Sequence, residues 1–308
     1  MLVRARHRAD FDNLAMPSPL ADALPSTPCH LDGDYLPLRD AKVSVLDRGF
    51  IFGDGVYEVV PVYGGKLFGF EEHMARLDRS LAELHIPNPH ALEGWRAIAE
   101  RLLRDAPAAP TQAVYIQVTR GVAMRDHAMP SGLVPTVFAM VNPLKPVSAD
   151  ARANGVRCVT AEDFRWQKAH IKATSLLGAV LARQISVEAG AAETIMFRGD
   201  LLSEASSSNV WVVKNGVVAG PQPDHRVLRG IRYGLLERLC RQTGIPYALR
   251  DITREEVFAA DELLLSSASK EVLAVTTLDD RPVGNGRPGP IYERLYAAYQ
   301  QAKQAAAA

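Results

Sequence analysis

Stretches with a strand pattern alternate with helical stretches along this chain, and the connections between them are short. Turn signals at Asp32-Gly33 and Gly64-Gly65 join strand patterns directly, which is typical of antiparallel hairpins. Helices between strands, by contrast, accompany parallel crossovers. This mixture excludes a regular βαβ series and predicts an α/β fold of the mixed α+β kind, with mixed sheets and flanking helices.

The alternation assigns an expected element to most of the chain. Met74, Leu77 and Leu81, for example, recur at helical spacing after two acidic residues. We expect a hairpin within residues 30–47, helices over 71–85, 92–103, 176–188 and 231–243 and from Pro290 onward, and strands over 56–63, 66–70, 113–119, 136–141, 155–160, 194–197, 209–213, 262–266 and 272–276 and around Ala248.

The segment 142–150 (NPLKPVSAD) has two prolines and few apolar residues, so we expect the boundary between two domains there. A small N-terminal α/β domain would cover residues 27–145, and a larger C-terminal domain would cover residues 150–308. Residues 1–26 carry early arginines and several prolines but no apolar run of a secretory signal. We therefore expect a flexible N-terminal extension over residues 1–26.

Charge and cysteine content exclude several classes of protein. Lys plus Arg and Asp plus Glu are equal at 35 each in 308 residues, with no long basic run, which disfavours nucleic-acid binding. No apolar stretch reaches the ~18 residues of a membrane span. Cys29, Cys158 and Cys240 lie far apart and match no metal or disulfide motif. We expect reduced thiols, no metal site and a cytoplasmic location.

Lys172 lies in FRWQKAHIKATSLLGAV (164–180), between Ile171 and Ala173 and just before an apolar helix. A lysine in such surroundings loses hydration, which favours the neutral amine needed to form a Schiff base with an aldehyde. The alternative is an ordinary surface lysine at a strand edge.

A second candidate is Glu204 in LSEASSSNV (202–210), an isolated acid followed by three hydroxyls and an amide. A carboxylate here can pair with a cationic ring nitrogen, and hydroxyls such as that of Ser207 can bind an anion. The alternative is a turn or a helix N-cap, where serine and asparagine are favoured regardless.

Two further stretches suit anions. In LRGIR (228–232) a glycine precedes the helix expected from Ile231, so free backbone N–H groups suit a phosphate, with Ser267 as a further contact. Arg125 and His127 follow a strand and, two residues apart in an extended loop, suit a small carboxylate. The alternatives are an ordinary helix start and a solvated loop. Together with Lys172 and Glu204, these features are what a pyridoxal 5'-phosphate (PLP) enzyme needs.

Five ordered motifs resemble those of the class IV, fold-type IV aminotransferases over residues 30–299. They are DRGFIFGDGVYEVV (47–60), EEHMARL (71–77), QVTRGVAMRDH (117–127), IKATSLLGAVLA (171–182) and SEASSSNV (203–210). The resemblance implies two domains with mixed sheets, a barrel-like core and PLP at the domain interface. Within the family, the Arg125/His127 pair points to the branch that acts on D-amino acids.

The resemblance also implies a role for each matching residue. Lys172 would hold the cofactor and move the α-proton, and Glu204 would keep the pyridine nitrogen protonated. Arg125 and His127 would serve the neighbouring subunit's site, which implies a homodimer. The remaining matches are phosphate contacts at Arg76, Ile231 and Ser267, a ring-face contact at Leu228, a substrate-carboxylate contact at Tyr57, and further cofactor contacts at Ser207 and Arg232. Arg232 and Ala268 stand where the family often has threonine, so their effect on phosphate binding stays open.

The function implied is a PLP-dependent transaminase that moves the amino group of a D-amino acid, such as D-alanine, to a 2-oxo acid, such as 2-oxoglutarate, with ping-pong kinetics. The alternatives of the same fold are a branched-chain L-amino acid aminotransferase and an aminodeoxychorismate lyase. A cofactor-free dimer without activity is a further alternative, disfavoured by the presence of both Lys172 and Glu204.

Overall fold

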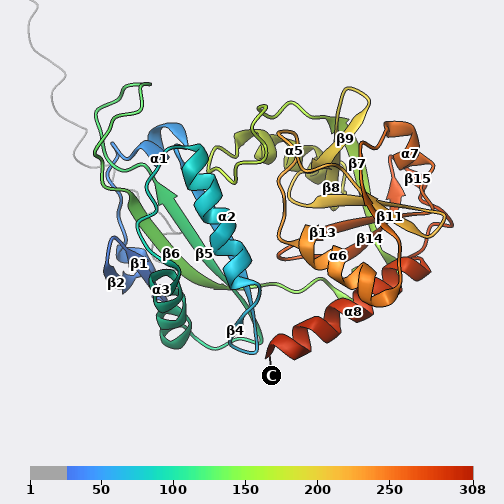
Figure 1. Cartoon of the computed structure of the whole chain (residues 1–308), viewed down its shortest axis with the longest axis horizontal. Coiled ribbons are helices and arrows are strands. Elements are labelled where there is room, and N and C mark those ends of the chain that lie inside the picture. Colours follow the sequence, from blue (N-terminus) through green and yellow to red (C-terminus); the bar gives the residue numbers. More distant parts are fainter. Residues whose placement is uncertain (1–25, 308) are drawn as a thin grey trace, which may run out of the picture.

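Two separate β-sheets organise the chain, one in each half of the sequence (Figure 1). The computed structural model describes residues 26–307. The N-terminal sheet has six strands in the order β2-β1-β6-β5-β3-β4, and every neighbouring pair is antiparallel. Its strands are β1 (Pro28–Leu31), β2 (Asp34–Pro37), β3 (Gly55–Tyr63), β4 (Lys66–Leu67), β5 (Thr111–Thr119) and β6 (Thr136–Pro143).

Two amphipathic helices, α2 (Phe70–Glu83) and α3 (Leu92–Asp105), cover the N-terminal sheet. Leu77 of α2 and Trp95 of α3 are fully buried against apolar strand residues such as Val60. A short helix, α1 (Arg48–Phe52), leads into β3 and is capped by Asp47, whose carboxylate accepts from the Gly49 N–H. The turn after β2 is a 3-10 helix (Leu38–Asp40).

The C-terminal sheet has nine strands in the order β12-β11-β10-β13-β14-β7-β8-β9, with β15 added on β14. Its pairs β14–β7, β7–β8 and β11–β12 are parallel, and the others are antiparallel. The strands are β7 (Val156–Glu162), β8 (Glu193–Arg198), β9 (Leu201–Ala205), β10 (Asn209–Lys214), β11 (Val217–Gly220), β12 (Tyr247–Leu249), β13 (Glu262–Ser267), β14 (Glu271–Leu278) and β15 (Arg281–Pro282).

Helices flank this second sheet, and one of them reaches the first half of the chain. α8 (Pro290–Ala307) packs on α6 (Arg232–Thr243) and β14, and its far end lies beside β4 (Figure 1). Phe68, after β4, contacts the ring of Tyr299 in α8 with centroids 6.0 Å apart. The remaining helices are α4 (Ala149–Asn154), α5 (Leu177–Glu188) and α7 (Arg254–Phe258). α8 therefore ties the two halves together.

The mixed sheets and flanking helices confirm the predicted fold class. The expected strands and helices occur within a few residues of their predicted bounds. The exception is the strand expected over residues 66–70, which ends at Leu67, so that Phe70 already belongs to α2. The sequence pattern missed α1, α4, α7, β9, β11 and β15. β9 was missed because Ser203 and Glu204 are polar yet buried.

The predicted linker over 142–150 is partly regular, since β6 ends at Pro143 and α4 begins at Ala149, capped by Ser148. The domain bounds 27–145 and 150–308 stay predictions. The expected extension over residues 1–26 lies, apart from Ser26, outside the described residues. Between residues 26 and 307, no helix is both long and apolar enough to cross a membrane.

Candidate functional site

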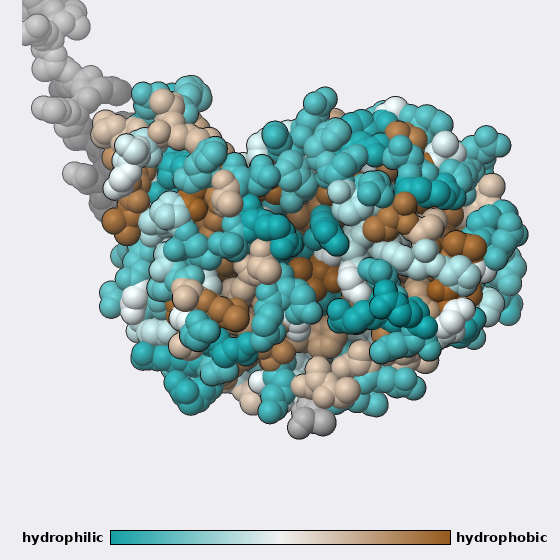
Figure 2. Space-filling view, viewed as in Figure 1, coloured by the Kyte–Doolittle hydropathy of each residue, from teal (hydrophilic) through white to brown (hydrophobic). Residues whose placement is uncertain are grey.

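The segment that follows Lys172 is hydrogen-bonded to the start of β3, so the lysine lies where the two halves of the chain meet. The Tyr57 N–H donates to the Lys172 carbonyl at 3.0 Å, and the Thr174 N–H donates to the Gly55 carbonyl at 2.9 Å. The hydroxyls of Thr174 and Ser175 donate to the Gly53 carbonyl. On the face shown in Figure 2, a notch opens between the two lobes at the end that carries α1 and α5.

The side chain of Lys172 is half-buried, and its Nζ lies 4.0 Å from the centroid of the Tyr57 ring. This contact places the amine of Lys172 over the face of the Tyr57 ring. Behind it, the rings of Tyr57 and Tyr115 stack at 5.9 Å. The backbone N–H of Lys172 donates to Ser80 Oγ on α2, at 3.3 Å. The structure thus brings Lys172 and Tyr57 together.

Glu204 lies on β9 and is only 6% exposed. Its Oε1 accepts from Arg165 Nη1 at 2.6 Å, and its Oε2 accepts from Asn209 Nδ2 at 3.1 Å and from the Leu228 N–H at 3.2 Å. Burial raises the pKa of Glu204, and the charge of Arg165 opposes that rise. A carboxylate has about four acceptor sites. Three are used, which leaves one at Oε1 for a further N–H donor.

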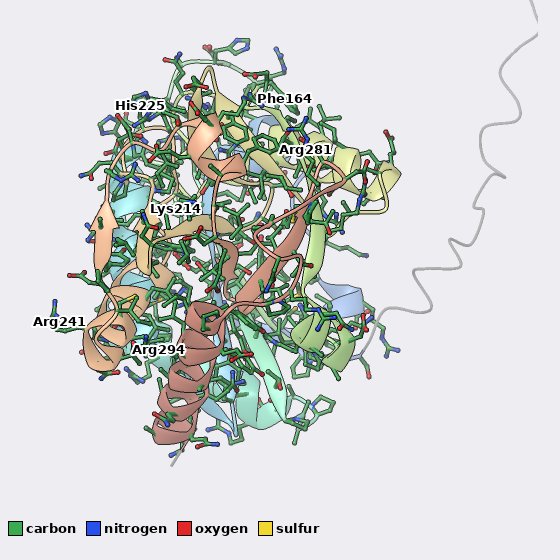
Figure 3. All side chains as sticks on the ribbon, turned by 90° about the vertical axis from the view of Figure 1, so that its right-hand side faces the viewer. Phe164, Lys214, His225, Arg241, Arg281 and Arg294 are labelled. Carbon is green, nitrogen blue, oxygen red and sulfur yellow. The ribbon has the colours of Figure 1, made fainter. Side chains whose placement is uncertain are left out.

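Arg165, which sequence reasoning missed, is held rigidly behind Glu204. Its Nε and Nη2 both donate to Asp163 at 2.9 Å, and Arg198 Nη2 donates to the same carboxylate at 3.1 Å. Phe164, the preceding residue, lies at the same end of the C-terminal half as His225 and at the opposite end from Arg294 of α8 (Figure 3). The available signal was an acid and an arginine two residues apart in EDFRW.

Arg76 of α2 is buried and bound to Glu58 of β3 through two bonds, Nε to Oε1 at 2.7 Å and Nη2 to Oε2 at 2.8 Å. Its Nη1 donates to the Arg229 carbonyl at 3.4 Å, which brings Arg76 to the loop before α6. Burial raises the pKa of Glu58, but Arg76 and His73 outweigh it and hold the pKa well below its usual range. The signal that sequence reasoning missed was Glu58 itself, a lone acid in an apolar strand.

The start of α6 has no side-chain cap, and its N-cap residue is Ile231. The first N–H groups of such a helix remain available to an anion. Asn209 supports this loop, because its Nδ2 also donates to the Leu228 carbonyl at 2.9 Å. A Cβ on Gly230 would lie 2.1 Å from Asn209 Oδ1, so only glycine fits there. Leu228 is thus placed beside the acid at residue 204, three residues before Ile231.

The serine run belongs to a separate polar cluster. The hydroxyls of Ser206, Ser207 and Ser208 all donate to the buried carboxylate of Glu193, and Lys270 Nζ donates to the same group at 2.7 Å. Within the run, Ser207 is the exposed residue, and it also accepts from Lys270 Nζ at 3.0 Å. Ser267, the other predicted phosphate contact, is half-buried, and its Oγ accepts from the Lys270 N–H at 3.1 Å.

Arg125 and His127 lie together in an exposed loop against Phe52 of α1. The Arg125 guanidinium and the His127 ring each lie 5.5 Å from the Phe52 ring centroid. Arg48 holds the loop through a 2.6 Å bond from Nη1 to the Asp126 carbonyl. Within residues 26–307, no hydrogen bond, ion pair, aromatic contact or cation–π contact joins either side chain to Lys172 or Tyr57. No group of three or more metal-binding side chains occurs in the same range.

The chain is similar to known aminotransferases over most of its length. The family model described as Amino-transferase class IV matches residues 55–278. A D-alanine aminotransferase of Staphylococcus aureus (strain COL) is 37% identical over 271 residues, 88% of this chain and 96% of the relative. A D-alanine aminotransferase of Bacillus licheniformis is 36% identical over 269 residues, 87% and 94% of the two chains.

Solved structures share the fold at lower identity. A branched-chain amino acid aminotransferase from T.th., solved with pyridoxamine 5'-phosphate, has a TM-score of 0.86 at 22% identity, over 92% of this chain and 95% of that one. The branched-chain amino acid aminotransferase of Escherichia coli has a TM-score of 0.83 at 23% identity, over 90% and 94%.

Proposed function

The chain belongs to the class IV aminotransferase family, and on this premise we propose that it moves the amino group of a D-amino acid such as D-alanine to a 2-oxo acid such as 2-oxoglutarate. The observation that carries the proposal is the placement of Lys172 and Tyr57 at the seam of the two halves, with Glu204 buried beside the loop before α6. The names of the relatives at 36–37% identity support the choice of donor.

The residues present fit PLP as the cofactor. The uncapped start of α6 and the neighbouring Arg76 suit its phosphate, with Ser207, Ser267 and Arg232 as further contacts. Leu228 would lie on the ring face, and the free acceptor site of Glu204 suits a protonated ring nitrogen. When bound, PLP supplies an electron sink for the bond broken at the substrate α-carbon.

The side chains of the protein then have separate roles. Lys172 would act as the general base that takes the α-proton of the donor, since its amine lies beside Tyr57 where the two halves of the chain meet. Glu204 keeps the ring nitrogen protonated, with Arg165 holding the carboxylate in place. Tyr57, Arg125 and His127 orient the substrate carboxylate, which decides the stereochemistry.

We further propose a homodimer in which Arg125 and His127 complete the site of the partner. Their own protomer leaves them exposed, and apolar side chains are exposed around them: Phe50 at 70% and Met124 at 78%. Exposed apolar surface of this kind is typical of an interface. The proposal places the enzyme in the cytoplasm, where its free and buried thiols, Cys29, Cys158 and Cys240, stay reduced.

The proposal is tested first for the cofactor and then for the substrate. The protein with bound PLP should be yellow, and borohydride should bleach it and attach the cofactor permanently to Lys172. Lys172→Ala should abolish multiple-turnover transamination. A panel of D- and L-amino acid donors with 2-oxoglutarate follows. We expect pyruvate from D-alanine; pyruvate from L-alanine alone, or preference for branched-chain L-amino acids, would refute the D-specific assignment. Pyruvate formed from aminodeoxychorismate without any amino acceptor would indicate the lyase.

A further inference from the structure

The loop that joins β5 to β6, residues 121–135, carries Arg125 and His127 and extends beside α1 (Figure 1). We call it the clamp loop. Its first residues, 121–123, exchange backbone hydrogen bonds with the segment 46–48 at the start of α1. The rest of the loop has no regular secondary structure. Because ordering such a loop costs conformational entropy, the positions of its two basic side chains depend on contacts with other segments.

Arg48 makes the bond that holds the middle of the clamp loop. Its side chain is buried, and its Nη1 donates to the Asp126 carbonyl at 2.6 Å. Between residues 26 and 307, this is the one hydrogen bond that a group outside the loop makes to residues 124–134. Asp126 lies between Arg125 and His127, so the bond restrains the backbone that carries both side chains.

Phe52, the last residue of α1, contacts both of these side chains. Its ring centroid lies 5.5 Å from the Arg125 guanidinium carbon and 5.5 Å from the centroid of the His127 ring. The guanidinium carbon of Arg48 lies 4.7 Å from the same centroid. An aromatic face attracts a guanidinium. One half-buried ring therefore contacts Arg125, His127 and the arginine that holds the backbone between them.

Arg48 is itself held by Asp54, whose Oδ2 accepts from Arg48 Nε at 2.8 Å. The same carboxylate is bound by Arg120, through Nε at 2.7 Å and Nη2 at 3.0 Å. Burial raises the pKa of Asp54, but the two arginines outweigh that effect and lower the pKa. The carboxylate therefore stays charged, and both pairs are charge-assisted hydrogen bonds.

Asp54 lies in a turn that is packed against the segment after Lys172. The Thr174 hydroxyl donates to the Gly53 carbonyl at 2.9 Å. Gly53 has φ +66°, and a Cβ on it would lie 2.7 Å from Ser175 Oγ. The turn has little room to shift, which makes Asp54 a fixed anchor for Arg48. One turn thus connects the chain's own lysine segment with the clamp loop.

We propose that Arg48 and Phe52 are positioning residues, which hold the clamp loop so that Arg125 and His127 reach the α-carboxylate of the amino donor together. This inference rests on the proposed function, in which those two residues bind that carboxylate. Two separate donors bind one carboxylate well only in a particular relative arrangement, and fixing that arrangement beforehand improves affinity. Arg48 and Phe52 act through the loop and not on the substrate itself.

The first test is limited proteolysis of the holoenzyme with thermolysin, with fragments identified by mass. Arg48→Met and Phe52→Leu should each speed cleavage within the clamp loop about fivefold to tenfold, because cleavage follows local opening. Arg120→Met is the matched control. Arg120 binds the same Asp54, but its other side-chain bonds go to carbonyls just after α2 and none goes to the clamp loop. Its loop should be cleaved at the wild-type rate.

The second test separates KM from kcat with D-alanine as donor. Arg48→Met should raise KM about tenfold and Phe52→Leu about threefold, each with kcat within about twofold of the wild type, because a carboxylate contact is lost equally from ground state and transition state. Phe52→Tyr keeps the aromatic face and should restore the wild-type KM. Arg120→Met should keep the wild-type KM as well.

Three results would overturn the positioning role. The first is wild-type cleavage of the clamp loop in both Arg48→Met and Phe52→Leu. The second is faster cleavage in both variants with an unchanged KM. The third is an equal rise in KM in Arg120→Met, which would trace the effect to Asp54 in general. Failure of the proposed function is distinct: the wild type would not transaminate D-alanine, whereas proteolysis would still report whether Arg48 and Phe52 hold the loop.

Discussion

Arg165 Nη1 donates to Glu204 Oε1 at 2.6 Å, so a buried acid is held by an arginine 39 residues away in sequence. Arg165→Met removes the charge that opposes the effect of burial on the Glu204 pKa, and that pKa should rise further. The acid limb of the kcat–pH profile should move to higher pH, and kcat at neutral pH should fall about tenfold to a hundredfold.

Arg198→Met is the matched control, because Arg198 binds the same Asp163 carboxylate but not Glu204. Its kcat–pH profile should keep the wild-type midpoint. A profile in Arg165→Met that coincides with that of Arg198→Met would show that Arg165 has only a structural role.

Glu204 could be predicted from the sequence as a site residue, whereas its partner Arg165 could not. Lys172 and Glu204 were recognisable because each is an isolated charged residue in an apolar setting. Gly230 likewise indicated the start of α6. Arg165, Glu58 and Glu193 were not recognisable, because they bind Glu204, Arg76 and the serine run through contacts between residues that are separated in the chain. Local patterns carry no information on which buried charges meet.

The serine run illustrates the same limit. Three consecutive hydroxyls indicated a turn or an anion site, and the structure places all three on the carboxylate of Glu193. Glu193 begins β8, where period-2 and apolar patterns gave no reason to single out an acid. Fold class and element order, by contrast, follow from local patterns, which is why they were predicted with few errors.

Two glycines at the start of α6 should respond oppositely to alanine. In Gly230→Ala the new Cβ meets Asn209 Oδ1 at 2.1 Å, so Asn209 must release its bonds to Glu204 and to the Leu228 carbonyl. We expect a loss of about 1–3 kcal/mol in unfolding free energy and faster loss of cofactor on dialysis.

Gly234→Ala, one turn along the same helix, places its Cβ in open space. It should raise the unfolding free energy by about 0.5–1 kcal/mol, since alanine is the better helix former, and leave cofactor retention unchanged. Equal behaviour of the two variants in urea unfolding and dialysis would contradict the role given to Asn209.

His73 predicts a specific loss of stability in acid. Burial lowers its pKa from 6.5 to about 4, against the opposing effect of Glu58. The unfolded chain therefore takes up this proton first, so its stabilising contribution is complete above pH 6.5 and is lost progressively down to about pH 4. Between pH 7 and 4.5 this group alone should cost about 2–3 kcal/mol.

Urea unfolding of His73→Asn at these two pH values measures that contribution. The variant should be less stable at pH 7 and should lose less on acidification than the wild type. His225→Asn, at an exposed position, should follow the wild-type dependence. An unchanged acid dependence in His73→Asn would mean that other groups dominate it.

Arg125 and Lys172 should complement each other only across the dimer. Lys172→Ala and Arg125→Ala should each be inactive with D-alanine as homodimers, the first through loss of the base and the second through loss of the carboxylate contact. In the heterodimer, purified with two different tags, one site combines an intact Lys172 with the intact Arg125 of the other chain. That heterodimer should retain about half of the wild-type kcat per dimer.

If Arg125 instead served its own chain, both sites of the heterodimer would carry one substitution, and the preparation would be inactive. An active Arg125→Ala homodimer with an unchanged KM would remove the residue from the substrate site altogether. The exposed position of Arg125 against Phe52, with no hydrogen bond or ion pair to its own site, is the reason to expect complementation.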